Sequence, residues 1–206
     1  MTVICLTGGI SSGKSTAARF LRECGAHVID ADQLGHRAYE PGTDAYARVV
    51  EAFGEEIVAD DGQIDRRALG GKVFGDPAAL ERLTDIVWPE IRRLAENEIE
   101  AIQESDPDRV VVLEAAVLLE AGWEDIGDEI WVVTVDRDTA VTRATSRDGV
   151  DEAAIQARID AQLSNEERAA RADVVIDNGG TEAELLELLR TEWQRVSAYA
   201  GPEEAS

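Results

Sequence analysis

Short apolar runs alternate with stretches of helical periodicity along this chain. Several of the runs are rich in Val and Ile and are bounded by turn residues, which is typical of strands that are buried on both faces. Alternation of such strands with helices favours a parallel sheet that helices cover on both sides. The five strands are expected at Thr2–Leu6, Ala26–Ile29, Arg109–Leu113, Glu129–Val135 and Asp173–Ile176.

The helical stretches lie at the two ends of the chain and in two long segments between strands. Helices are expected at about Lys14–Glu23 and at about Thr181–Ala198, where an apolar stripe suits packing on the core. From Ala31 to about Ser105 helical patterns are broken only by turn signals, which predicts a helical insertion. The stretch Arg137–Arg171 is also helical, with Gly149 as its one clear break, and could close over a ligand.

The length of the chain bounds its organisation. A chain of 206 residues can form one α/β domain with a sizeable core and one or two inserted helical pieces. We therefore expect a single folding unit. Its core is expected at residues 1–30, 106–136 and 172–200, with the helical insertion at 31–105 and a lid at 137–171.

A glycine-rich segment lies directly between the first strand and the first helix. It reads Gly8-Gly9-Ile10-Ser11-Ser12-Gly13-Lys14-Ser15 and fits the P-loop pattern G-x-x-x-x-G-K-[ST]. Such a loop turns its backbone N–H groups toward a triphosphate, and the next helix points its positive end at the phosphates. Lys14 adds a charge on the β- and γ-phosphates, and the Ser15 hydroxyl is placed to bind Mg²⁺. The residues expected to bind ATP are Gly8, Gly9, Ser11, Ser12, Gly13, Lys14, Ser15 and Thr16.

Carboxylates follow the second and third strands, where ligands collect in doubly wound folds. A hydroxyl acceptor needs a carboxylate that orients it and takes its proton. One of Asp30 and Asp32 is therefore expected to face the cleft and the other to cap the next helix, the alternative being that both are caps. Glu114 ends the third strand and is expected to hold the Mg²⁺ hydration shell, or else to face solvent.

The net charge of the chain and its scarcity of lysine limit the kinds of ligand and partner that it is expected to bind. A net charge of -23 argues against a nucleic-acid-binding surface, which requires a basic face. Acidic excess with lysine only at positions 14 and 72 suggests adaptation to high salt, the alternative being an ordinary acidic protein. The scarcity of lysine also leaves no Asn-Lys-x-Asp segment for guanine recognition, which argues against a GTP-dependent switch protein.

Cysteine usage and hydropathy indicate the compartment. Cys5 and Cys24 are too few for a disulfide framework or a zinc site, and the N-terminus runs into a strand without an export signal, so a cytoplasmic location is expected. No apolar run approaches the roughly 20 residues of a membrane-spanning helix. We expect a protein without membrane partners and a monomer, with an oligomer as the alternative.

Strings along nearly the whole chain resemble the dephospho-CoA kinase family in order and spacing. They are the P-loop with Thr7 and Thr16, and the segments 28–32, 40–42, 53–54, 61–62 with 65–66, 73–74 and 172–178. The likeness is closest to the kinase domain of the eukaryotic bifunctional CoA synthase, through the segments 34–39, 83–89 and 115–123. Most bacterial members carry His-Pro where this sequence has Trp88-Pro89, so an imidazole contact to the acceptor is not expected here.

The resemblance implies a P-loop NTPase fold and ATP-dependent phosphorylation of the 3′-hydroxyl of dephospho-CoA, the last step of coenzyme A synthesis. It implies that Asp32 is the catalytic base and that Arg66 contributes to the acceptor site. It also implies that Arg143 and Arg147 bind ATP from the lid and that Asn178, at the end of the last matching string, contributes to the ATP site.

Two alternatives stay open from the residues themselves. Arg143 and Arg147 lie four residues apart, which suits two guanidinium groups that converge on one anion but also a solvated basic stripe. A nucleoside or nucleoside monophosphate kinase would share the P-loop, the insertion and an arginine-bearing lid. It would differ in its acceptor.

Overall fold

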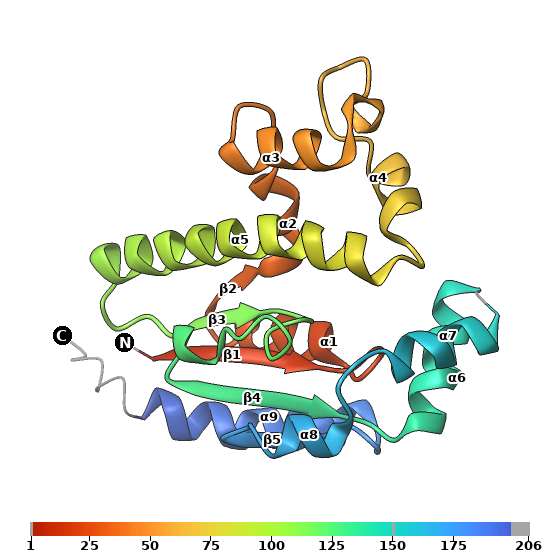
Figure 1. Cartoon of the computed structure of the whole chain (residues 1–206). Helices are drawn as coiled ribbons and strands as arrows, with labels where there is room; N and C mark the ends of the chain where they lie inside the picture. Colours follow the sequence, from red (N-terminus) through yellow and green to blue (C-terminus); the bar gives the residue numbers. More distant parts are fainter. Residues whose placement is uncertain (1, 150, 199–206) are drawn as a thin grey trace. The chain divides into compact units, whose positions relative to one another are not determined.

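The computed structural model describes residues 2–149 and 151–198, and a five-stranded sheet organises it (Figure 1). β1 pairs in parallel with β3 and with β4, and β4 pairs in parallel with β5. The strand order is β2-β3-β1-β4-β5. The predicted fold class, a parallel sheet flanked by helices, is confirmed. The strands are β1 (Val3–Gly8), β2 (His27–Asp30), β3 (Val111–Glu114), β4 (Glu129–Thr134) and β5 (Val174–Asp177).

The chain divides into two compact units. The sheet unit comprises residues 2–29 and 99–198 of the described chain, and the helical unit comprises residues 30–98. β1 runs two residues further than the sequence predicts, because Thr7 and Gly8 pair with β4. The central strand therefore leads directly into the glycine-rich segment.

The core of the sheet unit lies between the sheet and two helices, α1 (Lys14–Glu23) and α9 (Glu182–Ser197). Ile4 and Leu6 of β1 are fully buried in it, as is Trp131 of β4. Because side chains alternate along a strand, Ile4 and Leu6 share one face of β1. The apolar stripe predicted for the last helix packs on the core through Leu185, Leu186, Leu189 and Trp193, whereas Leu188, also expected in it, is exposed.

Three more helices of the sheet unit follow β4: α6 (Arg137–Asp148), α7 (Glu152–Asp160) and α8 (Asn165–Ala169). Gly149 ends α6 in the left-handed conformation, at φ 62°, as its position as a break suggests. A second break, at residues 161–164, is not predicted by the sequence pattern. There Ser164 begins α8 with a capping box, because its hydroxyl accepts from the Glu167 N–H and the Glu167 carboxylate accepts from the Ser164 N–H.

The helical unit forms helices where the periodicity predicts them. They are α2 (Ala31–Ala38), α3 (Asp44–Phe53), the short 3₁₀ helix η1 (Glu55–Ile57), α4 (Arg66–Val73) and α5 (Pro77–Ser105), whose last seven residues belong to the sheet unit. Side chains that favour turns cap two of them: Thr43 accepts from a backbone N–H of α3, and Asp65 from two of α4. Within residues 2–149 and 151–198, none of the helices is both long and apolar enough to cross a bilayer.

Candidate active site

The glycine-rich segment between β1 and α1, which we call the P-loop (Gly8–Ser15), needs glycine at two positions. Gly13 adopts φ 104°, and a Cβ atom there would lie 2.3 Å from Nδ2 of Asn178. A Cβ atom on Gly8 would lie 2.3 Å from the carbonyl oxygen of Val133 in β4. Both contacts are far too short for a side chain, so the sequence pattern follows from close backbone packing.

The middle of the P-loop is a strained turn. Ser11 has φ 54°, and among the described residues no other non-glycine residue has a positive φ. A left-handed conformation costs such a residue roughly 1 kcal/mol, so neighbouring contacts must hold it. The Ser12 N–H donates to the Gly9 carbonyl at 3.3 Å, and Nδ2 of Asn178 donates to the Ser12 carbonyl at 2.7 Å.

Lys14 and Ser15 begin α1, beside the end of β3. Nζ of Lys14 donates to the carbonyl oxygens of Gly8 and Gly9 at 3.0 and 3.4 Å. The Ser15 hydroxyl donates to Oε1 of Glu114 at 3.3 Å. The structure therefore brings together Ser15 and Glu114, which the sequence proposed separately as Mg²⁺ ligands.

The donor set at Ser15 and Glu114 fits Mg²⁺ bound together with a nucleotide. Mg²⁺ usually keeps several waters and takes one or two protein oxygens plus phosphate oxygens, rather than a cage of protein ligands. A hydroxyl and a carboxylate oxygen, 3.3 Å apart, match that pattern. No cluster of three or more His, Cys, Asp or Glu side chains suited to a metal occurs in the described part of the chain.

Two arginines of α6 share a cavity with the P-loop. This cavity has a volume of about 230 Å³ and is lined by residues 11–16 together with Arg143 and Arg147. The Oγ atoms of Ser11 and Ser12 are buried and have no hydrogen-bond partner, although buried hydroxyls are normally satisfied. Arg143 and Arg147 thus lie beside the phosphate-binding loop, while their convergence on one anion stays a prediction.

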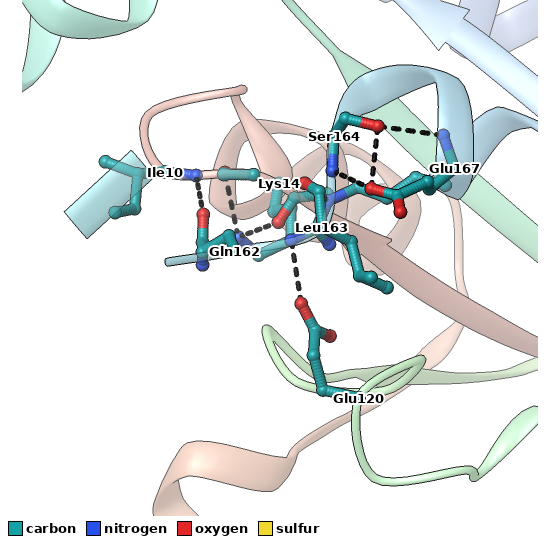
Figure 2. A network of polar contacts seen from close by, with 10 residues as sticks. Ile10, Lys14, Glu120, Gln162, Leu163, Ser164 and Glu167 are labelled. Atoms are coloured by element: carbon teal, nitrogen blue, oxygen red, sulfur yellow. Dashed lines mark hydrogen bonds and ion pairs between the residues drawn. The ribbon is translucent and has the colours of Figure 1, made fainter. Parts of the chain in front are cut away.

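A second, larger cavity of about 410 Å³ lies on another side of the P-loop. The Ile10 N–H donates to Oε1 of Gln162 at 3.0 Å in this region (Figure 2). Sequence reasoning missed Gln162, because it lies in a stretch that was expected to be helical and belongs to no motif. The cavity is lined by Gly9, Ile10, Ser12, Val135, Arg137, Ala140, Ile159, Asp160, Gln162, Leu163, Ser164, Asn165 and Glu167.

The two aspartates after β2 have different surroundings. Oδ1 of Asp30 accepts from the N–H groups of Asp32 and Gln33 at 2.9 and 3.2 Å, and its Oδ2 accepts from the Gln33 side chain at 2.9 Å. Asp30 is therefore the N-cap of α2. The Asp32 side chain is exposed in the first turn of that helix. The predicted helix cap is present and belongs to Asp30, which leaves the Asp32 carboxylate for another role.

The other residue assigned to the acceptor, Arg66, also lies in the helical unit, as do Trp88, Pro89 and His36, which were given no acceptor role. Arg66 is the first residue of α4, and its side chain is exposed. Trp88 and Pro89 lie inside α5, and Trp88 is half-buried. His36 is exposed on α2. Arg66 and Asp32 are thus both accessible to a ligand within their own unit.

Comparisons with known proteins agree with this geometry. Residues 2–184 match the family model described as dephospho-CoA kinase. A dephospho-CoA kinase of Geobacter sulfurreducens is 49% identical over 195 residues, which cover 95% of this chain and 98% of that protein. One of Geobacter metallireducens is 45% identical and covers 94% of this chain and 96% of that protein.

Two solved structures have the same fold. The crystal structure of TT1252 from Thermus thermophilus superposes with a TM-score of 0.80 at 36% identity and covers 98% of both chains. A dephospho-CoA kinase from Campylobacter jejuni superposes with a TM-score of 0.73 at 23% identity, over 97% of this chain and 98% of that one, which supports the fold alone.

Proposed function

The chain belongs to the dephospho-CoA kinase family, and on that premise we propose that it transfers the γ-phosphate of ATP to the 3′-hydroxyl of dephospho-CoA. One observation carries the proposal from the structure's side. The P-loop and two arginines of α6 line a single cavity, and two buried serine hydroxyls of the loop lack protein partners. A triphosphate supplies the charge and the acceptor oxygens that such a cavity requires.

The P-loop and α6 would bind and stabilise the phosphates. The loop amides of residues 11–16 and the N-terminus of α1 face a cavity that suits an anion. Lys14 would leave the carbonyl oxygens of Gly8 and Gly9 for the β- and γ-phosphates, and Arg143 and Arg147 would approach from the lid. These fixed positive groups stabilise the charge that shifts toward the leaving ADP in the transition state.

Ser15 and Glu114 would hold the Mg²⁺ ion that accompanies ATP. When bound, the ion neutralises phosphate charge. The 3.3 Å separation of the Ser15 hydroxyl from Glu114 supports this assignment, because one direct oxygen ligand and one carboxylate nearby suit a largely hydrated ion.

Asp32 would act as the catalytic base, and residues 31–105 as the acceptor-binding insertion. As the bond between the 3′-oxygen and the γ-phosphorus forms, Asp32 takes the hydroxyl proton and the bond to the ADP oxygen breaks. Its exposure and its place outside the helix cap support this role. Arg66 would bind the acceptor, while residues 137–171 would act as the lid.

A coupled assay tests the proposed reaction. The purified chain is offered ATP with dephospho-CoA, adenosine, uridine or nucleoside monophosphates, and ADP release and coenzyme A formation are measured. Turnover is expected with dephospho-CoA alone. Turnover restricted to a nucleoside or nucleoside monophosphate would replace this proposal with the alternative kinase class.

Other expectations from the sequence stay predictions. They are the cytoplasmic location, the monomeric state, the adaptation to salt and the particular likeness to the eukaryotic CoA synthase, since the relatives described above are bacterial. Measuring turnover and thermal stability at low ionic strength and in molar salt tests the adaptation. Equal stability in both would contradict it.

A further inference from the structure

The segment between α7 and α8 meets the P-loop in a contact that none of the roles above uses. Oε1 of Gln162 accepts the backbone N–H of Ile10 at 3.0 Å, across 152 residues of sequence (Figure 2). Gln162 lies in the stretch 161–164, where the lid segment changes from one helix to the next. The bond therefore joins the predicted lid to the phosphate-binding loop.

The Ile10 N–H is placed where the P-loop most needs support. Ile10 directly precedes Ser11, the residue with φ 54°. On the other side of Ser11, the carbonyl oxygen of Ser12 accepts from Asn178 at 2.7 Å. The strained residue thus has a long-range side-chain hydrogen bond on each side, with Gln162 before it and Asn178 after it.

The smaller cavity distinguishes Ile10 from residues 11–16, although Gly9 and Ser12, which are also expected to bind ATP, line the larger cavity with it. Residues 11–16 line the smaller cavity with Arg143 and Arg147. Ile10 lines the larger cavity, together with Gln162. Its N–H is therefore satisfied by the lid segment, which suits support of the loop's shape rather than direct phosphate binding.

The backbone that follows Gln162 is itself fixed. Nδ2 of Asn165 donates to the carbonyl oxygen of Val135, just beyond β4, at 2.7 Å. The fully buried Arg168 donates from Nε to the carbonyl of Leu163 at 3.1 Å and from Nη2 to Oε1 of Glu120 at 2.9 Å. Breaking a buried ion pair is costly, so these contacts restrict movement of the segment that carries Gln162.

We propose that Gln162 is a positioning residue for the nucleotide. Its side-chain oxygen holds the P-loop in the shape that turns the amides of residues 11–16 toward the triphosphate, and it couples the lid segment to that shape. Without this acceptor the loop spends time in other shapes, and apparent nucleotide affinity falls in proportion to the competent fraction. The inference rests on the proposed function only in taking ATP and ADP as the nucleotides.

The variant Gln162→Met tests the inference, because methionine has a similar length and offers no comparable acceptor. ADP affinity, measured by calorimetry, should fall about three- to tenfold, which is the range expected for one net hydrogen bond. The KM for dephospho-CoA and the thermal midpoint should stay unchanged. Hydrogen exchange at the Ile10 amide should become faster in the nucleotide-free protein.

Two further variants separate positioning from general packing. Gln156→Met, in α7, is the matched control, because the Gln156 amide bonds Glu152 within its own helix. Its ADP affinity should equal that of wild type. Gln162→Glu keeps an oxygen acceptor and should keep the Ile10 amide protected. If Gln162→Met does not fold, Gln162→Ala is measured in the same way.

Three results would overturn the inference. They are unchanged ADP affinity in Gln162→Met, an equal loss in Gln156→Met, and a lowered thermal midpoint with normal affinity at 25 °C. The proposed reaction is judged separately, by turnover of dephospho-CoA with the wild-type protein. If dephospho-CoA is not turned over, the role of Gln162 in nucleotide binding is still judged by the ADP affinities of the variants.

Discussion

The sheet unit and the helical unit are built in different ways. In the sheet unit a continuous apolar core joins the sheet to α1 and α9, and large side chains such as Ile4, Leu6 and Trp131 are fully buried. The helical unit holds most of the long helix α5, but of the largest fully buried side chains in the described chain only Ile57 belongs to it, and its Phe74 is 80% exposed. Units with less buried apolar surface open more readily.

This difference suits the two substrates. Phosphate binding needs backbone groups in fixed positions, and the sheet unit supplies them from a loop that close packing leaves little room to move. An elongated acceptor such as dephospho-CoA is better served by a unit that can adjust. Substitutions in the sheet unit should therefore weaken nucleotide binding or phosphate transfer. Substitutions in the helical unit, which we propose binds the acceptor, should impair the use of dephospho-CoA.

Removing the P-loop lysine should have the largest effect. Lys14→Ala should lower kcat by roughly three orders of magnitude, because it removes a charge that stabilises the transferring phosphate, while the fold stays intact. The coupled assay with dephospho-CoA and a thermal melt measure both quantities. Lys72→Ala is the matched control, since Lys72 pairs with the exposed Glu56 in the helical unit. Near-normal turnover in Lys14→Ala would refute the assigned role.

Removing the proposed catalytic base should show that the two units have different roles in the reaction. Asp32→Asn should lower kcat about 100-fold, the scale of general base catalysis, and leave ADP affinity unchanged. Asp30→Asn provides the control, because asparagine also caps helices and the Asp30 carboxylate serves α2. Equal losses in the two variants would assign the effect to the helix rather than to a base.

The sequence predicts the sheet unit well because its signals are local. Short β-branched runs between turn residues mark the five strands, each found within a few residues of its expected ends. The P-loop pattern is equally local along the chain, and two of its three glycines, Gly8 and Gly13, stand where a side chain would not fit. The placement of Arg143 and Arg147 on one face of a helix is also a local signal, because residues four apart lie one helical turn from each other.

The features that sequence reasoning missed depend on distant contacts. Gln162 reaches Ile10 across 152 residues. Asn178 was expected at the ATP site through the resemblance, but its hydrogen bond to the Ser12 carbonyl, across 166 residues, was not. The buried pair of Arg168 and Glu120 is also invisible in the pattern, because a helix of alternating charge normally faces solvent. Such contacts are set by how the lid segment and the turn after β5 pack on the sheet.

A pair of arginine variants compares the units directly. Arg143→Gln, in the sheet unit, should raise the KM for ATP about tenfold and leave that for dephospho-CoA unchanged. Arg66→Gln, in the helical unit, should do the reverse. The magnitude corresponds to the loss of one charge-assisted hydrogen bond. Steady-state kinetics with each substrate varied in turn gives both KM values. A raised KM for dephospho-CoA in Arg143→Gln and a raised KM for ATP in Arg66→Gln would contradict the assigned roles.

The smallest effect concerns ion pairs and pH. In the sheet unit the Arg195 guanidinium binds the Glu129 carboxylate through two hydrogen bonds of 2.7 and 2.5 Å. These bonds, with a further one from Trp131, hold the pKa of Glu129 below its ordinary value of 4.5. In the helical unit Lys72 likewise lowers the pKa of Glu56, a side chain that is 66% exposed.

A lowered pKa in the folded state means stability that is present above the ordinary pKa and is lost as the pH falls through the folded value. Glu129→Gln should therefore lower the free energy of unfolding by about 0.5–1 kcal/mol at pH 7, and the difference from wild type should shrink at an acid pH below 4.5, as the Glu129 carboxylate of the wild type becomes protonated. Glu56→Gln should cost less at pH 7, because solvent screens an exposed pair. Urea unfolding at the two pH values measures these differences. An equal loss of unfolding free energy in both variants at pH 7 would mean that solvent screens the two ion pairs to the same degree, which would contradict the predicted difference between the units.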